Sequence, residues 1–435
     1  MKRSAMKELL EWKKKTGRKP LIIRGVRQSG KTWLMKEFGK THFNSFSYIN
    51  FDNNSRMQKL FSGDYDIKHI ISGLELESGV NINPENTLII LDEIQECASA
   101  ISSLKYFNEN APEYMIVAAG SQLGIALHSG ASFPVGKVEF LELFPMSYFE
   151  FIRAAEKEKL LGPVDAGDFG LTNAFSDKYI ELLRNYYFTG GMPEAVAEFI
   201  NTGSYEKTRQ IQKNILLAYE QDFSKHIPAG VVPRLRMLWN SIPAQLSKEN
   251  HKFIYGLIRH GARAKEYETA LTWLSDYGLS SGVKRIRKPG IPLKAYEDNS
   301  IFKLYISDVG LLGALCGLDA KSLLEGNRIF TEFKGALSEQ YVFQELKTLK
   351  DIHISYWTAE KGLAEVDFIV QSEGKVIPFE VKAEENLKAK SLRSYRDLYK
   401  PSIAVRASMS GFKKDQGLLN IPLYLISCFQ RIIRQ

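Results

Sequence analysis

A short segment near the N-terminus has the residue types and the spacing of a phosphate-binding loop. The pattern G-x-x-x-x-G-K-S/T is met in full by Gly25, Val26, Arg27, Gln28, Ser29, Gly30, Lys31 and Thr32. Glycines let the backbone curl until successive N–H groups face phosphate oxygens, a lysine meets the β- and γ-phosphates, and a threonine hydroxyl is a ligand for Mg²⁺. Because an apolar strand precedes the segment and a helix follows it, we expect a nucleoside triphosphate site here rather than an unrelated glycine turn.

An acidic pair follows an apolar run further along the chain. Residues 88–91 are all Leu or Ile and are followed by Asp92 and Glu93. At the end of a buried strand, Asp92 would hold Mg²⁺, partly through water, and Glu93 would polarise the attacking water as general base. The strand expected at 114–119 leads to Ser121, whose hydroxyl would touch the γ-phosphate or the water. An ordinary acidic turn and an ordinary polar loop are the alternatives.

Near the C-terminus, residues 365–382 predict a β-hairpin that brings two carboxylates and a lysine together. Alternation along the second strand places Glu380 and Lys382 on the same face, and Asp367 lies on the partner strand. Asp367 and Glu380 would form a hard oxygen site suited to Mg²⁺, and Lys382 would activate a water and stabilise charge on a phosphate. Glu339, on the helix before the hairpin, would complete the ring. The alternative is a salt-bridged hairpin face on an ordinary α/β domain.

These candidate residues depend on a set of α/β elements. From about residue 20 to residue 120, short apolar strands alternate with helical stretches, which predicts a parallel sheet covered on both faces. Residues 141–201 have a mostly helical pattern, and the C-terminal part returns to α/β. We expect strands at 21–23, 46–51, 88–91, 114–119, 353–357, 365–370 and 376–382, and helices at 32–38, 100–108, 335–349 and 388–399.

The middle of the chain predicts a winged helix. Two short helices at 253–258 and 265–277, joined by a turn, are followed by a hairpin at about 281–295. Four of the five residues from Lys284 to Lys288 are basic. One helix would enter a major groove and the basic hairpin would contact phosphates. Winged helices also serve as protein contacts, and a charged hairpin is commonly a solvated edge, so DNA contact is one of two open alternatives.

The composition is that of a globular protein with several domains. The 435 residues suffice for about three domains at roughly 150 residues each. Hydrophobic residues make up 44% and charged residues 25% of the chain, which argues against a disordered or coiled-coil protein. The 58 basic and 50 acidic residues give a net charge of +8, which permits a polyanionic partner without requiring one.

Cysteine usage and hydropathy predict a cytoplasmic protein. Cys97, Cys316 and Cys428 are odd in number and far apart, so neither a disulfide framework nor a zinc site is expected. No run of about 18 apolar residues occurs, so we expect no membrane span. The first residues are charged, lack the apolar segment of a signal peptide, and predict a short amphipathic helix.

Taken together, the motifs resemble those of prokaryotic AAA-type ATPases, and more narrowly the subgroup fused to a nuclease-like C-terminal domain of unknown function. The resemblance covers nearly the whole chain and rests on Gly25–Thr32, Asp92-Glu93-Ile94-Gln95, Gly120-Ser121-Gln122, Leu141–Tyr148 and Gly190-Gly191-Met192-Pro193. It implies ATP binding, slow hydrolysis and an ATP-driven conformational cycle. It also implies that Ser121 is the sensor residue, although the family often has a second serine where Gln122 stands.

The C-terminal segment from about residue 335 to residue 399 resembles a nuclease superfamily. Its motif is an acidic residue and, further along the chain, Asp or Glu followed by one spacer residue and Lys. Asp367 matches the first position, and Glu380 and Lys382 match the later two. The proline that usually precedes the first acidic residue is Val366 here. The resemblance implies Mg²⁺-dependent cleavage of nucleic acid, and such folds also occur as binding modules without activity.

The sequence therefore predicts three parts. Residues 1–203 would be a P-loop AAA-type ATPase domain with a helical extension, 204–325 a helical winged-helix-like module, and 326–435 a restriction-endonuclease-like α/β domain. One hypothesis is an ATP-hydrolysing protein that acts on DNA through a Mg²⁺-dependent site. The other is a nucleotide-controlled switch whose C-terminal domain only binds a protein or nucleic acid. ATP is the expected small-molecule partner, no membrane is expected, and the oligomeric state is open.

Overall fold

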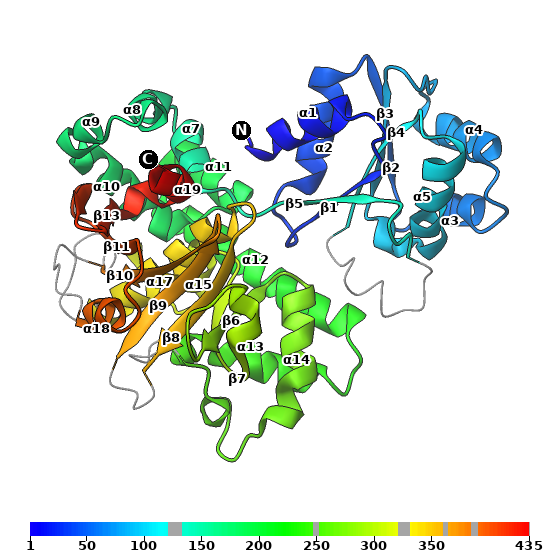
Figure 1. Ribbon diagram of the computed structural model, residues 1–435. Helices are drawn as coiled ribbons and strands as arrows, with labels where there is room; N and C mark the ends of the chain where they lie inside the picture. The colour runs from blue at the N-terminus through cyan, green and yellow to red at the C-terminus, as the bar shows by residue number, and fades with distance from the viewer. Residues whose placement is uncertain (121–132, 247–251, 321–330, 360–363, 384–389, 435) are drawn as a thin grey trace. The chain divides into compact units, whose positions relative to one another are not determined.

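The computed structural model describes residues 1–120, 133–246, 252–320, 331–359, 364–383 and 390–434 (Figure 1). The chain forms two compact units, one made of residues 1–144 with 276–278 and the other of 145–275 with 279–435. Each unit has its own sheet.

The first unit contains a five-stranded sheet in the order β2-β3-β4-β1-β5, in which every neighbouring pair is parallel. Its strands are β1 (Leu21–Arg24), β2 (Ser45–Asn50), β3 (Thr87–Asp92), β4 (Met115–Ala119) and β5 (Glu139–Glu142). Its helices are α1 (Ala5–Lys14), α2 (Lys31–His42), α3 (Ser55–Phe61), α4 (Ile67–Ser78), η1 (Ile94–Glu96) and α5 (Ala98–Asn110).

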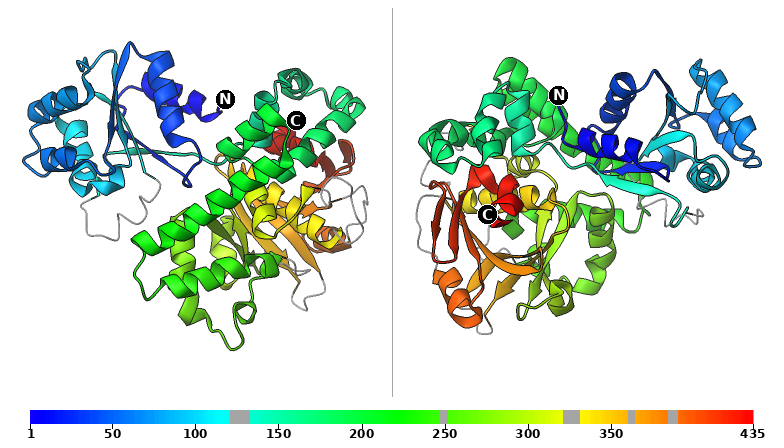
Figure 2. Two further views of the ribbon diagram at one scale, coloured as in Figure 1. Left: turned by 180° about the vertical axis from the view of Figure 1, so that it is seen from behind. Right: turned by 45° about the horizontal axis from the view of Figure 1, so that its top comes forward.

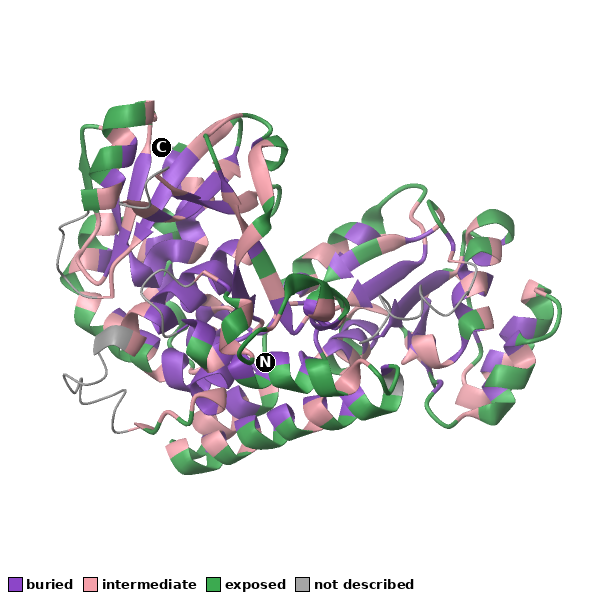
Figure 3. Ribbon diagram, turned by 90° about the horizontal axis from the view of Figure 1, so that it is seen from below, coloured by how far each residue is buried: buried purple, intermediate pink, exposed green. Residues whose placement is uncertain are grey.

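The central strands are apolar throughout because alternate side chains enter two different cores. Ile89 and Ile116 pack with α3, α4 and α5, whereas Ile90 and Val117 pack with α1 and α2. All residues of β3 and β4 are buried, and Figure 3 shows buried strand segments in both sheets of the protein. The predicted parallel sheet with two covered faces is confirmed. Strand β5 was not predicted, because it overlaps the start of residues 141–201, whose sequence pattern is mostly helical.

The second unit is built on an eight-stranded mixed sheet in the order β12-β13-β11-β10-β9-β8-β6-β7 (Figure 1). Its strands are β6 (Ser280–Ile286), β7 (Glu297–Ile306), β8 (His353–Thr358), β9 (Glu365–Ser372), β10 (Lys375–Val381), β11 (Ala404–Ser408), β12 (Lys413–Asp415) and β13 (Leu418–Pro422). Strands on both sides of residue 325 thus belong to one sheet, because β6 of the middle segment pairs in parallel with β8. The three-part division of the chain stays a prediction.

Helices make up the rest of the second unit. Before the sheet come α7 (Tyr148–Ala154), η3 (Glu158–Leu160), α8 (Leu161–Ala166), α9 (Phe169–Ala174), α10 (Ser176–Thr189), α11 (Pro193–Thr202), α12 (Tyr205–His226), α13 (Val232–Leu246), η4 (Tyr255–Leu257) and α14 (Ala264–Asp276). Between its strands come η5 (Leu293–Tyr296), α15 (Val309–Leu315), α17 (Thr331–Lys347) and α18 (Lys390–Tyr399), and after the last strand come η7 (Leu423–Cys428) and α19 (Phe429–Arg434). The long helix α12 packs along α11 and α15 (Figure 2).

The helix expected at 253–258 is wrong. Only Tyr255–Leu257 is helical there, as the single 3-10 turn η4. The N–H of Phe253 instead donates to the carbonyl oxygen of Phe302 on β7 at 2.9 Å, and the two rings stack with centroids 5.0 Å apart. Aromatic packing against a strand has overridden the local helical pattern, so the winged-helix interpretation is not confirmed. The helix expected at 265–277 is confirmed as α14.

The Gly190–Pro193 motif has a packing role. A Cβ atom at Gly191 would lie 2.1 Å from the carbonyl oxygen of Met146. The Gly191 N–H donates to Asp308 Oδ2 at 2.6 Å, and Asp308 Oδ1 accepts the Leu311 N–H at 2.9 Å and so caps α15. Burial raises the pKa of Asp308 to about 6. The motif thus holds the turn between α10 and α11 against α15.

Two observations bear on the whole chain. None of the described helices combines the length and the apolar composition that crossing a lipid bilayer requires. The three cysteines are free thiols, of which Cys97 and Cys428 are buried and Cys316 is partly exposed. Burial raises the pKa of the Cys316 thiol to about 12 and that of Cys428 to about 11, so neither thiol is activated.

Candidate functional site

The predicted phosphate loop lies between β1 and α2 and is shaped by two glycines. Gly30 has a φ of 92° directly before α2, a conformation that residues with a Cβ atom rarely adopt. A Cβ atom at Gly25 would lie 2.2 Å from the carbonyl oxygen of Leu143, so no larger side chain fits. The Ser29 N–H donates to the carbonyl oxygen of Val26 at 3.2 Å, which closes the turn. The backbone therefore curls as the sequence predicts.

The middle of the loop carries a buried hydroxyl that has no partner. Gln28, next to Arg27, has a φ of 65°, so the turn passes through the left-handed region. The carbonyl oxygen of Ser29 accepts a hydrogen bond from Arg3 Nη1 at 2.8 Å, whereas Ser29 Oγ is buried without a hydrogen-bond partner. Unpaired buried polar atoms in folded proteins call for an explanation. A phosphate oxygen in the loop would supply the missing partner.

Lys31 is buried inside the loop. Its Nζ donates to the carbonyl oxygens of Gly25 and Val26, both at 2.9 Å. Burial lowers the pKa of Lys31 to about 8, and the carboxylates of Glu93 and Asp92 oppose part of this shift. An anion that binds beside a buried ammonium group stabilises it, because the anion favours the charged form over the neutral one.

Thr32 and Asp92 are in direct contact. Thr32 Oγ1 donates to Asp92 Oδ2 at 2.7 Å, and the Tyr48 hydroxyl donates to the same oxygen at 3.0 Å. Asp92 is 2% exposed at the end of β3. A hydroxyl and a carboxylate that meet in a buried position are the hard oxygen donors that Mg²⁺ prefers. The donor set therefore fits the expected magnesium ion.

Glu93 has a strained backbone and a restrained carboxylate. Its φ is 50°, a left-handed conformation that is uncommon for residues other than glycine. Its N–H donates to Asp92 Oδ1 at 3.1 Å, and Gln95 Nε2 donates to its carboxylate at 2.7 Å. Since strained residues cluster at functional sites, this conformation agrees with a role for Glu93 beside the phosphate loop. The predicted sensor Ser121 lies outside the described residues.

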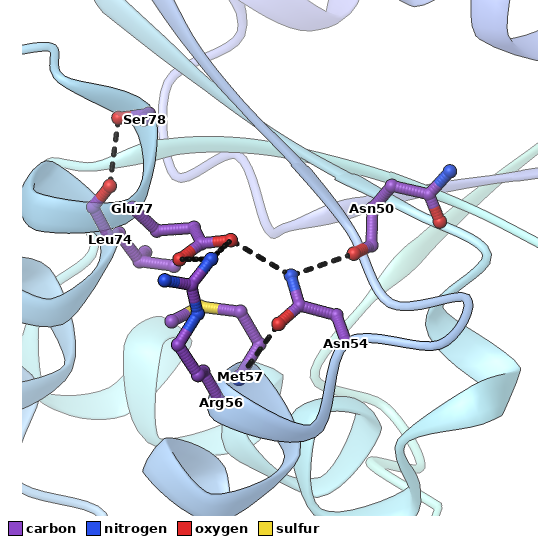
Figure 4. A network of polar contacts seen from close by, with 7 residues as sticks. All are labelled: Asn50, Asn54, Arg56, Met57, Leu74, Glu77 and Ser78. Atoms are coloured by element: carbon purple, nitrogen blue, oxygen red, sulfur yellow. Dashed lines mark hydrogen bonds and ion pairs between the residues drawn. The ribbon is translucent and has the colours of Figure 1, made fainter.

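A polar network fixes the chain where it leaves β2. Asn50, the last residue of β2, is in register with Asp92. Asn54 Nδ2 donates to the carbonyl oxygen of Asn50 at 3.2 Å and to Glu77 Oε1 at 3.0 Å (Figure 4). Asn54 Oδ1 accepts the Met57 N–H at 3.2 Å and caps α3. The network holds the end of β2 beside the strand that carries the acidic pair.

A second group of candidate residues lies on the hairpin β9–β10 of the other unit. Continuing the antiparallel register by one residue pairs Asp367 with Glu380, and directly opposite residues face the same side of a sheet. Asp367 Oδ2 accepts the Val381 N–H at 2.7 Å, and Lys382 Nζ lies 2.7 Å from Glu380 Oε1. The hairpin thus brings together the two carboxylates and the lysine that the sequence pattern selects.

The predicted Glu339 joins this group from α17, and a lysine from β7 lies between them. Lys303 Nζ is 2.9 Å from Glu339 Oε1 and 2.7 Å from Glu365 Oε1. Lys303 is 0% exposed. The Tyr305 hydroxyl, also on β7, donates to Glu339 Oε1. We call the set Lys303, Glu339, Glu365, Asp367, Glu380 and Lys382 the C-terminal cluster.

The electrostatics of the C-terminal cluster are dominated by burial and by like charges. Burial raises the pKa of Asp367 well above its usual value, and repulsion from Glu380 and Glu339 adds to the effect. Burial also raises the pKa of Glu380, against the attraction of Lys382. Burial alone would lower the pKa of Lys303, but the three carboxylates around it raise it above its usual value.

One carboxylate oxygen of the cluster has no partner. Glu380 is 4% exposed, and its Oε2 is buried without a hydrogen bond. In the described part of the chain, no group of three or more His, Cys, Asp and Glu side chains is arranged to hold a metal ion. The cluster therefore offers a cation the pair Asp367 and Glu380 rather than a complete set of ligands, and the predicted metal role of this pair stays a prediction.

Three residues of these sites were not among those that the sequence predicts. Glu365 shares a strand face with Asp367, so alternation could have identified it. Lys303 stands in the apolar run 301–306, where a lysine signals a buried partner. Tyr48 gives no signal, because an aromatic residue in a strand is ordinary.

The basic hairpin of the middle segment is paired with acidic residues. Arg285 and Arg287 lie 2.7 Å and 3.6 Å from Asp298 Oδ2, and Lys284 lies 3.4 Å from Glu297 Oε2. These partners come from β7, the second strand of the same hairpin. Much of the positive charge expected to meet phosphates is therefore neutralised within the hairpin.

Comparison with protein families gives three matches. Residues 17–152 match the AAA domain family, residues 180–322 match a domain of unknown function, DUF8612, and residues 334–426 match another, DUF4143. The first match covers the segment that contains the parallel sheet and its loop between β1 and α2, so this segment is similar to AAA domains. The other two descriptions carry no activity, so the nuclease likeness stays a prediction. No curated protein matches the chain.

Several solved structures match the chain at low identity. The Walker-type ATPase PABY2304 of Pyrococcus abyssi is 14% identical, with a TM-score of 0.45, over 72% of this chain and 95% of that one. Cdc6p from Pyrobaculum aerophilum is 12% identical, with a TM-score of 0.26, over 71% and 88%. The Orc1 protein of Aeropyrum pernix, in complex with DNA, is 11% identical, with a TM-score of 0.27, over 72% and 91%. Such scores establish neither a shared ligand nor a shared activity.

Proposed function

We propose that this chain binds ATP with Mg²⁺ at residues 25–32 and hydrolyses it. The observation that carries the proposal is the contact between Thr32 and Asp92 at 2.7 Å, beside the buried Lys31. Backbone N–H groups at the start of α2 and the Lys31 ammonium would bind the phosphates. Thr32 and Asp92 would hold Mg²⁺, which when bound neutralises charge on the β- and γ-phosphates.

The catalytic residue of this site would be Glu93. Its carboxylate would accept a proton from the attacking water while Gln95 keeps it oriented through the hydrogen bond of 2.7 Å. We assign the sensor role to Ser121, as the family resemblance implies.

Binding is tested by thermal melting with and without ATP and Mg²⁺. A ligand that binds only the folded protein raises its melting temperature, and Lys31→Ala should lose that rise. Lys40→Ala is the matched control, because Lys40 is exposed in the last turn of the same helix. An ATP-dependent rise in Lys31→Ala equal to that of the parent protein would refute the assignment.

We propose as a second function that the C-terminal cluster binds Mg²⁺ and cleaves DNA. The observations in its favour are the Asp367 carboxylate, which accepts the N–H of Val381 at 2.7 Å, and the unpartnered Glu380 Oε2 beside it. Lys382 would stabilise charge on a phosphate. Incubation of the purified protein with plasmid and Mg²⁺ or Mn²⁺ should give nicks, which Lys382→Ala abolishes and Lys375→Ala, on the same strand, preserves.

The competing function is a nucleotide-controlled binding switch. Two observations favour it: Lys303 already fills one end of the cluster, and the basic hairpin is paired with its own carboxylates. If the protein is such a switch, plasmid is not nicked with any metal ion, whether or not ATP is present, and the second unit only contacts a partner. The plasmid experiment separates the two functions, and the ATP site is common to both.

A further inference from the structure

The C-terminal cluster contains more carboxylates than ammonium groups. Glu339, Glu365, Asp367 and Glu380 face Lys303 and Lys382, which leaves a formal charge of −2 when all six groups are ionised. The pair Lys382 and Glu380 lies at one end, at 2.7 Å. Lys303 lies at the other end, within ion-pair distance of Glu339 and Glu365. The charge of Asp367 also raises the pKa of the Lys303 ammonium.

The Lys303 ammonium lies within ion-pair distance of two carboxylates. Carboxylate oxygens from a helix and a strand surround its ammonium, which is 0% exposed. Buried charges persist in proteins only when they are paired or coordinate a metal. The same oxygen atoms are the ligands that Mg²⁺ and Mn²⁺ prefer, so an ammonium and a divalent ion exclude each other from this position.

The lysine and the carboxylates come from different segments of the chain. Lys303 lies in the segment that matches DUF8612, at 180–322, whereas the carboxylates lie in the segment that matches DUF4143, at 334–426. Strand β7 also sends Tyr305 to Glu339, so two side chains of one strand hold this glutamate. The cluster is therefore completed by the middle segment and is not a property of the C-terminal segment alone.

We propose that Lys303 is a built-in cation of the C-terminal cluster, which takes the place of a divalent metal ion between Glu339, Glu365 and Asp367. A metal ion would then be left with the other end of the cluster, where Glu380 Oε2 has no partner. This inference deepens the second proposed function and rests on the same site. It assigns to Lys303 the control of how many divalent ions the site accepts.

The proposal is tested by counting bound Mn²⁺ in the full chain. Both the parent and Lys303→Met carry Asp92→Asn, so that the ATP site contributes no ion. Titration calorimetry and the electron paramagnetic resonance signal of free Mn²⁺ then give the dissociation constant for Mn²⁺ and the number of ions bound per chain. Removing one positive charge from among the carboxylates should tighten Mn²⁺ binding by at least about tenfold. Lys303→Arg, which keeps the charge, should behave as the parent does, and Glu365→Gln added to Lys303→Met should reverse the gain.

Stability supplies a second readout. In EDTA, Lys303→Met should melt at a lower temperature than the parent, and Mn²⁺ should restore more of the loss than Na⁺ at equal ionic strength. If the variant does not fold without metal, refolding in Mn²⁺ replaces the melt. Unchanged Mn²⁺ affinity and number in a folded Lys303→Met, or an unfolded variant that Mn²⁺ does not rescue, would overturn the proposal. A parent protein that never nicks plasmid removes the proposed nuclease function, yet leaves a gain of Mn²⁺ binding in Lys303→Met as support for this inference.

Discussion

Two buried lysines, one in each unit, sit in opposite electrostatic surroundings. Lys31 is 7% exposed and donates to two neutral carbonyl groups, and burial lowers its pKa to about 8. Lys303 is 0% exposed and lies among three carboxylates that raise its pKa. The first ammonium still lacks an anionic partner, whereas the second is already paired.

The contrast teaches how a buried charge relates to function. An ammonium that is desolvated without an ion pair raises the free energy of the folded protein, and an anionic ligand relieves that cost. An ammonium that is fully paired stabilises the fold and closes its site to other cations. Lys31 therefore marks a site prepared for a ligand, and Lys303 marks a site that the chain itself occupies.

The largest effect should come from Glu93→Gln, which separates binding from chemistry at the site of Lys31. Loss of a general base lowers a rate by about 10²- to 10⁴-fold, while the uncharged amide leaves the phosphate contacts of Lys31 in place. ATP turnover should fall by that factor and the ATP-dependent rise in melting temperature should remain. Glu96→Gln, three residues away, is the control and should keep its turnover. Full turnover in Glu93→Gln would place the general base elsewhere.

The second prediction compares the two lysines directly, without nucleotide and in EDTA. Lys303→Met leaves buried carboxylates without their partner, which should cost about 3–5 kcal/mol of unfolding free energy. Lys31→Met removes an ammonium that burial disfavours, so its unfolding free energy should stay within about 1 kcal/mol of the parent value. Urea denaturation followed by circular dichroism measures both. Equal losses in the two variants would mean that the carboxylates do not distinguish Lys303.

The third prediction uses pH. The pKa of Lys31 is about 8 in the folded protein and 10.5 for an ordinary lysine, so between these values the unfolded chain binds more protons and stability rises with pH. Relative to Lys31→Met, the parent should gain on the order of 3 kcal/mol from pH 8 to pH 10.5. Saturating ATP should remove this rise, because phosphates favour the charged lysine.

Lys303 should give no slope in the same experiment. Its pKa is raised in the folded protein, so its stabilisation is complete below pH 10.5 and is lost only at higher pH. The difference between the parent and Lys303→Met should therefore be flat over the range in which Lys31 produces a slope. A slope of the same sign for both lysines would contradict the assigned surroundings.

How much of each site the sequence predicts depends on how its residues are linked. The phosphate loop is continuous in sequence, and its glycines and Lys31 act through a local backbone shape, so the motif fixes their geometry. Asp92 follows because parallel strands end at one edge of a sheet. Tyr48 does not follow, since its contact with Asp92 depends on the order of strands β2 and β3, which no local pattern encodes.

The C-terminal cluster shows where prediction stops. Alternation and one hairpin suffice to predict that Asp367 lies near Glu380, and Asp367 Oδ2 accepts the N–H of the next residue, Val381, at 2.7 Å. Lys303 reaches them only because β6 pairs with β8 and joins two segments into one sheet. The same long-range packing holds Phe253 against β7 and leaves only the 3-10 turn η4 of the helix expected at 253–258. Tertiary contacts of this kind leave at most an indirect trace in the sequence, such as one lysine within an apolar run.

The smallest predicted effect concerns the proposed ATP site, which contains Lys31. Tyr48→Phe removes the hydrogen bond of 3.0 Å to Asp92 Oδ2 and leaves the one from Thr32. A single hydrogen bond to a charged group contributes about 1.5 kcal/mol, so the dissociation constant for ATP with Mg²⁺ should rise by no more than about tenfold. Tyr65→Phe, a change at a ring that stacks on Tyr106, should leave it unchanged. If Tyr48→Phe instead binds ATP more tightly, the tyrosine competes with Mg²⁺ for Asp92, and the carboxylate, like those around Lys303, is partly closed by the chain's own hydrogen-bond donors.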